Sequence, residues 1–134
     1  MAANFQLEIV TPERLLVNEA AEEVLIPGKS GQLGVLPGHA PLITELGVGE
    51  IRYRNGNNTT RLAVAWGFAE VLPEKVTILA ETAERASEID LQRAESALAR
   101  AQERLKTPQA ETDIMRAEEA VKRAQTRVEV AKGS

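Results

Sequence analysis

The chain has 134 residues and a formal net charge of −4, with 43% hydrophobic, 27% charged and only 3% aromatic residues. An acidic chain with so few aromatic side chains is a poor binder of nucleic acid, because it offers neither a basic surface nor a stacking platform. Cysteine does not occur, which excludes disulfides and thiolate metal sites.

The N-terminal residues have no basic segment followed by an apolar run, so we expect no secretion signal. The sequence also lacks the run of about 18 apolar residues that a membrane-spanning helix needs. We therefore expect any membrane association to depend on a partner.

The sequence changes character near Thr82. Nearly all glycines and prolines precede this point, whereas the remainder is rich in Ala, Glu, Arg and Gln and can form uninterrupted helices. This change predicts two domains, comprising residues 1–83 and 84–134.

The first domain shows the alternation of apolar and polar residues that is typical of β-strands. Short apolar or alternating segments end at turn residues, and we expect strands around 5–10, 24–26, 33–36, 51–54, 61–72 and 76–79. The segment Asn55–Asn58 tolerates positive φ and predicts a hairpin. Eight to ten short strands at this spacing favour a β-sandwich or flattened barrel.

The second domain has two apolar seams with the spacing of a heptad repeat. The first seam is Leu91, Ala94, Leu98, Ala101 and Leu105, and the second is Ile114, Ala117, Val121, Ala124, Val128 and Ala131. Asp90 is a suitable N-cap for the first helix, and Thr107 with Pro108 predicts the start of the second. A short connection makes the pair antiparallel. Because about half of the seam residues are alanine, this hairpin should bury little area and detach easily.

No residue set predicts catalysis or metal binding. Gly28-Lys29-Ser30 resembles the end of a phosphate-binding loop, but a strand rather than a helix is expected to follow, so a turn is the favoured interpretation. His39 is the only histidine and has no cysteine or second histidine to act with, which favours a loop residue.

Several arginines gather on the predicted hairpin. With a turn near residue 108, Arg93 lies opposite Arg123 or Ala124, Asp90 opposite Arg127, and Arg100 opposite Arg116. Guanidinium groups brought together favour an anion such as phosphate. The alternative is a solvated helix face with ion pairs one turn apart, and the spacing leaves both interpretations open.

The segment from Ser30 to Leu42, SGQLGVLPGHAPL, resembles a characteristic stretch of the ε-subunit family of F-type ATP synthases, and the resemblance extends over essentially the whole chain. It implies a ten-stranded β-sandwich followed by an antiparallel two-helix hairpin. It also implies that the sandwich binds the γ-subunit and the c-subunit ring, while the hairpin either folds onto the sandwich or extends into the α/β hexamer and inhibits ATP hydrolysis.

Some bacterial members of this family bind ATP on the folded hairpin through an I/L-D-x-x-R-A motif, which Ile89-Asp90-Leu91-Gln92-Arg93-Ala94 matches. The resemblance therefore implies ATP as a regulatory ligand. The residues expected to bind it are Glu84, Ile89, Asp90, Arg93, Ala94, Arg100, Arg123 and Arg127. At Trp66 the chain departs from the family, in which a small residue is common.

The sequence thus predicts a non-catalytic central-stalk subunit that couples proton flow to ATP synthesis and regulates hydrolysis. We expect a peripheral location on the cytoplasmic face of an energy-transducing membrane, in bacteria the plasma membrane, reached through the complex. A nucleotide-binding or hydrolysing protein and a free adaptor module are the alternative interpretations.

Overall fold

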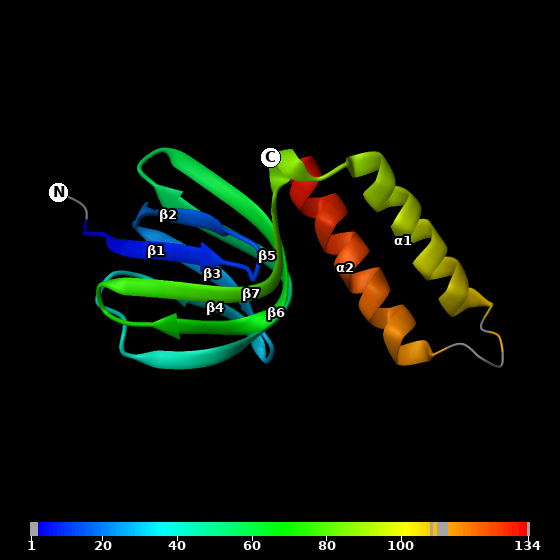
Figure 1. Cartoon of the computed structure of the whole chain (residues 1–134), viewed down its shortest axis with the longest axis horizontal. Coiled ribbons are helices and arrows are strands. Elements are labelled where there is room, and N and C mark those ends of the chain that lie inside the picture. The colour runs from blue at the N-terminus through cyan, green and yellow to red at the C-terminus, as the bar shows by residue number, and fades with distance from the viewer. Residues whose placement is uncertain (1–2, 108, 110–112, 134) are drawn as a thin grey trace.

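A computed structural model describes residues 3–107, 109 and 113–133. In this part of the chain a β-sandwich precedes two helices, as predicted (Figure 1). The elements are β1 Phe5–Val10, β2 Leu15–Ala21, β3 Glu23–Gly28, β4 Gly31–Val35, β5 Leu42–Asn55, β6 Asn58–Val71, β7 Lys75–Arg85, the 3₁₀ turn η1 Ala86–Glu88, α1 Leu91–Lys106 and α2 Ile114–Gly133.

The strands form one sheet in the order β2-β1-β7-β6-β5-β3-β4. All neighbours are antiparallel except β1 and β7, which run parallel. The sheet curls back on itself, so its inward positions meet in one core (Figure 1). Leu7, Ile9, Ile51 and Ile78 are completely buried there. The apolar residues of the predicted apolar–polar alternation therefore point inward and form the core.

The structure has seven strands in the described residues rather than the expected ten. The difference arises because β5 and β6 are each 14 residues long and pass through a bend near Gly67 without ending. Their ladder is interrupted between the pairs Leu46–Gly67 and Val48–Ala65, where Trp66 adopts a φ of 60° and Gly67 a φ of 125°. Strands β5 and β6 therefore each contribute to both layers of the sandwich, because the irregularity at Trp66 and Gly67 bends the strands without ending them.

Gly67 is required at this bend for a second reason. A Cβ atom at this position would lie 1.9 Å from the carbonyl oxygen of Leu79 on β7. Only glycine allows the two strands to approach this closely.

The ends of the helices partly follow the prediction. Asp90 caps α1, as expected, by accepting a hydrogen bond of 3.1 Å from the backbone N–H of Arg93. The expected start of the second helix at Thr107 is wrong, because Thr107 is the C-cap of α1. Pro108 lies outside the described residues. The second helix begins at Ile114, and Asp113 accepts a 3.1 Å hydrogen bond from the backbone N–H of Arg116.

Helix α2 lies between the sandwich and α1 (Figure 1). It therefore buries two faces, whereas the sequence indicated one. Ala117, Ala124 and Val128 belong to the predicted seam, and Thr126 and Val130 are also buried. Thr126 lines a small cavity of about 40 Å³ against β5, β6 and β7. The second face exists because the hairpin docks on the sheet.

Candidate functional site

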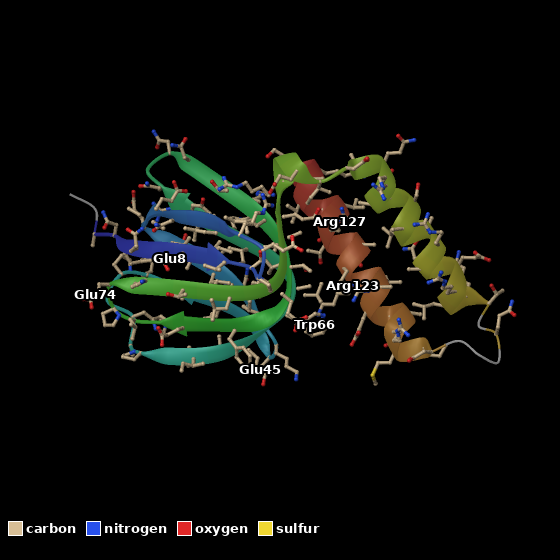
Figure 2. The ribbon with its side chains drawn as sticks, viewed as in Figure 1. Glu8, Glu45, Trp66, Glu74, Arg123 and Arg127 are labelled. Carbon is tan, nitrogen blue, oxygen red and sulfur yellow. The ribbon has the colours of Figure 1, made fainter. Side chains whose placement is uncertain are left out.

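The hairpin and the sandwich together form a groove of about 390 Å³. Three elements contribute to it. Its lining residues are Thr82 and Glu84 from β7, Ala97, Arg100, Ala101 and Arg104 from α1, and Ala120, Arg123, Ala124 and Arg127 from α2. Figure 2 labels Arg123 and Arg127 on the helix that lies next to the sandwich.

Local geometry explains why these side chains meet. Successive residues of a strand point to opposite faces, so Thr82 and Glu84 face the helices while Ala83 belongs to the sandwich core. Residues three and four apart in a helix share a face, which accounts for the sets 97–104 and 120–127. The alanines in both sets leave the space that the arginines surround.

An ion pair joins the sandwich to the hairpin inside this groove. Nε of Arg127 lies 2.8 Å from Oε1 of Glu84, and Nη2 of Arg127 donates to Oε2 at 3.1 Å. Both side chains are about one-third exposed, at 32% and 35%. Only the Nη2 contact is a hydrogen bond, because Nε is buried without a hydrogen-bond partner among the described residues and meets Oε1 as an ion-pair contact alone. The pair therefore sets the position of α2 on β7.

The other groove arginines have no such partner in the part of the chain that the structure describes. No described carboxylate oxygen lies within 4.0 Å of the guanidinium nitrogens of Arg100, Arg104 or Arg123. The groove therefore concentrates positive charge on a chain that is acidic as a whole. Such a surface attracts anions and matches the geometry of phosphate oxygens.

The motif at residues 89–94 has a different local role. Ile89 and Ala94 are buried in the small apolar cluster that includes Val128, and Asp90 caps α1. Arg93 is exposed and is not among the residues that line the groove. Of the eight predicted site residues, the groove thus unites Glu84, Arg100, Arg123 and Arg127, whereas the other four organise the start of α1.

The predicted pairing of facing positions is shifted. Arg100 lines the groove with Arg123 and Arg127 rather than with Arg116. Arg116 lines an adjoining hollow with Arg104 and Arg123. The shift follows from the start of α2 at Ile114, which is more than one helical turn later than the sequence suggested.

The other two candidates considered in the sequence, Gly28-Lys29-Ser30 and His39, have structural roles. Gly28 pairs with Gly31 across the β3–β4 turn, so Gly28-Lys29-Ser30 belongs to a hairpin rather than to a phosphate loop. A ring nitrogen of His39 lies 2.7 Å from the carbonyl oxygen of Ala40. Within the described ranges no group of acidic or histidine side chains is arranged to hold a metal ion. No helix there is sufficiently long and apolar to cross a membrane.

One surface was missed by the sequence analysis. Phe68 and Leu79 face each other across β6 and β7, and each is 53% exposed. They line an apolar hollow of about 410 Å³ with Val10, Thr11, Pro12, Gly67, Ala80 and Glu81. Exposed apolar patches of this kind mark sites of protein association. The sequence could have indicated this surface, because Phe68 and Leu79 are large apolar residues at strand positions that face solvent.

Comparisons with known proteins cover nearly the whole chain. The family model for the ATP synthase Delta/Epsilon chain beta-sandwich domain matches residues 4–86, and that for its long alpha-helix domain matches residues 87–132. The chain is 61% identical over 111 residues to the ATP synthase epsilon chain of Koribacter versatilis, covering 83% of this chain and 78% of that one. It is 50% identical over 110 residues to the epsilon chain of Carboxydothermus hydrogenoformans, covering 81% and 82%.

Solved structures share the fold. A chain of the Euglena gracilis mitochondrial ATP synthase superposes with a TM-score of 0.81 and 24% identity, over 92% of this chain and 79% of that one. A chain of the Tetrahymena thermophila mitochondrial ATP synthase gives a TM-score of 0.57 and 14% identity, over 98% and 96%. Identity at these levels supports the likeness in fold alone.

Proposed function

The chain belongs to the ATP synthase Delta/Epsilon chain family, and from this premise we propose that its sandwich anchors it in the complex while its hairpin senses ATP. It is an accessory subunit of the central stalk, in a complex that couples proton transport to ATP synthesis. The division of labour between the two parts is the proposal.

The sandwich is proposed to contact the γ-subunit and the c-subunit ring. The apolar hollow at Phe68 and Leu79 supports such a role, because it offers burial to a partner without help from the hairpin. Ile43 is 70% exposed and adds to the outward apolar surface. Through these contacts the chain would reside at the membrane surface as a peripheral component, on the cytoplasmic side of the bacterial plasma membrane.

The hairpin is proposed to bind ATP in the arginine groove. One observation carries this proposal: Glu84, Arg100 and Arg127 come from three different elements and line one cavity. Phosphate oxygens would neutralise guanidinium groups that have few carboxylate partners. Asp90, Ile89 and Ala94 support the site by fixing the start of the helix that carries Arg100. Arg93, exposed about two helical turns before Arg100, would contact the ligand from the rim.

This geometry supports a regulatory mechanism. The groove requires β7, α1 and α2 in their docked arrangement, so a ligand bound there favours that arrangement over any other. When ATP is scarce, the hairpin would leave the sandwich and meet the α/β hexamer, where it would inhibit hydrolysis. A ligand shifts such an equilibrium only by its differential affinity for the two states, and a site built from three elements supplies that difference.

Calorimetric titration of the full chain with ATP tests the proposal. Arg100→Gln and Arg127→Gln should each weaken binding about tenfold or more, because each removes a charge-assisted hydrogen bond. Lys122→Gln is the matched control, since it removes one positive charge from α2 at an exposed position outside the groove. The same preparation should release no phosphate from ATP. If the parent chain binds no ATP, or if the control weakens binding equally, the nucleotide part of the proposal is wrong.

A further inference from the structure

A second hollow of about 590 Å³ adjoins the arginine groove at the turn end of the hairpin. It is lined by Arg104, Gln109, Asp113, Arg116, Ala117, Ala120 and Arg123. Arg104, Ala120 and Arg123 also line the groove. The two cavities are therefore continuous, and together they extend along most of the hairpin.

The charges along this continuous channel are strongly unbalanced. Its described lining contains five arginines and two carboxylates. Both carboxylates are already engaged, because Glu84 pairs with Arg127 and Asp113 accepts from the backbone N–H of Arg116. Within the described ranges no carboxylate oxygen approaches the guanidinium nitrogens of Arg104 or Arg116 within 4.0 Å. Solvent screens part of the repulsion among these mostly exposed groups, and an anion in the channel would neutralise them further.

We propose that the channel binds linear inorganic polyphosphate, with the hollow at Arg104 and Arg116 as a phosphoryl subsite distinct from the nucleotide groove. The inference rests on the proposed function for the groove end, while the hollow stands on its own arginines. ATP and the polyphosphate chain would compete, because both require Arg123.

The shape of the channel favours a chain over a single ion. Arg116, Arg123 and Arg127 follow one another along α2, and eleven residues at a rise of 1.5 Å per residue give a row of about 16 Å. A single phosphate can meet only part of this row. A ligand with repeated phosphoryl groups meets all of it, and each guanidinium fork matches two phosphate oxygens.

Calorimetry on the full chain distinguishes this ligand from related anions. The probes are long-chain linear polyphosphate, tripolyphosphate, inorganic phosphate and a poly-glutamate peptide. We expect long-chain polyphosphate to bind most tightly, to be displaced by ATP, and to lose affinity steeply as salt rises because bound counterions are released. Equal binding of inorganic phosphate would indicate a single-ion site, and equal binding of poly-glutamate would indicate an acidic protein partner. Either result overturns the proposal.

Three variants locate the binding. Arg116→Gln should weaken polyphosphate binding about threefold to tenfold, as expected for one exposed charge-assisted contact, and leave ATP binding unchanged. Arg127→Gln should weaken both ligands, and Lys122→Gln should weaken neither. Equal effects of Arg116→Gln and Lys122→Gln would reduce the channel to general charge attraction and overturn the inference.

The two proposals fail separately in this design. Polyphosphate binding that depends on Arg116 without any ATP binding would refute the nucleotide proposal and leave the subsite standing. If ATP binding depends on Arg127 but polyphosphate binding is unchanged by Arg116→Gln, the polyphosphate subsite is refuted and the nucleotide proposal stands.

Discussion

The sandwich and the hairpin bury their apolar residues to very different extents. The sandwich core is made of large side chains such as Phe5, Leu7 and Ile78, each at most 2% exposed. The cluster between hairpin and sheet is smaller: its buried residues are Ala63, Ile89, Ala94, Val128 and Val130, and Ala86, Leu91, Leu98 and Ala131 pack against it partly buried. Because stabilisation scales with buried apolar area, alanines contribute far less than leucine or isoleucine.

This difference teaches where stability and adaptability lie in the molecule. The sandwich has a core of its own and should stay folded whatever the helices do. The hairpin contacts the sandwich through a small cluster and the Glu84–Arg127 ion pair, so we expect its docked arrangement to be less stable than the sandwich core. Substitutions in the two regions should therefore differ in size and in the part of the molecule that responds.

The largest effect is expected in the sandwich core. Ile78→Ala removes a completely buried side chain and should lower the free energy of unfolding by about 2–5 kcal/mol. Chemical denaturation followed by the fluorescence of Trp66 measures it. The neighbouring Leu79→Ala is the control, because Leu79 is 53% exposed and its loss should cost much less. Equal losses would show that the core is not where the structure places it.

The next effect concerns the bend in β6. Gly67→Ala combines a φ of 125° with a Cβ atom 1.9 Å from a carbonyl oxygen of β7, so we expect a loss of about 3 kcal/mol or more. Gly56→Ala is the control, since Gly56 also has positive φ, at 62°, but no atom lies near its added Cβ. It should cost about 1 kcal/mol. Similar losses of stability for both variants would mean that the close approach of β6 and β7 is not what requires glycine at position 67.

A smaller and more local effect is expected in the hairpin. Val128→Ala removes buried surface between α2 and its neighbours and should destabilise the docked hairpin by about 1–2 kcal/mol. Hydrogen exchange should accelerate in α1 and α2 while the strands keep their protection. The adjacent exposed residue offers the control Glu129→Ala. Faster exchange throughout the sandwich would contradict the separation of the two regions.

The smallest effect is a pH dependence of stability at the junction between the sandwich and the hairpin, where Glu88 lies in η1. The backbone N–H of Arg85 and the guanidinium of Arg14, 2.8 Å away, lower the pKa of Glu88 below its usual 4.5. A carboxyl with a lowered pKa stabilises the fold above its unfolded pKa, and this contribution disappears as pH falls through the folded pKa.

Because the side chains of this ion pair are 49% and 34% exposed and solvent screens them, the change should be about a few tenths of a kcal/mol. Denaturation midpoints of the parent chain and of Glu88→Gln, compared from neutral pH down to below pH 4.5, measure it. The two curves should converge in acid. Parallel curves would exclude Glu88 from the pH dependence of the junction.

The sequence by itself determined the order of the two domains and the type of element in each, but it indicated no strand at Leu15–Ala21, where β2 lies. Strand alternation, turn residues and the two alanine-rich seams are local patterns, and each is set by residues a few positions apart. Asp90 was identifiable as a cap for the same reason. Residue type marked Arg100, Arg123 and Arg127 as anion-binding candidates, and the family resemblance added Glu84 to the expected site. The structure brings these four residues into one groove.

Only the tertiary structure decided how those elements share space. The strand count depends on whether a bend ends a strand, and at Trp66 and Gly67 hydrogen bonding to neighbouring strands resumes on both sides of the bend. The pairing of Arg100 with Arg123 depends on where α2 begins, and the second buried face of α2, with Thr126, depends on docking against the sheet. These features arise from contacts between distant segments, which periodicity within one segment does not encode.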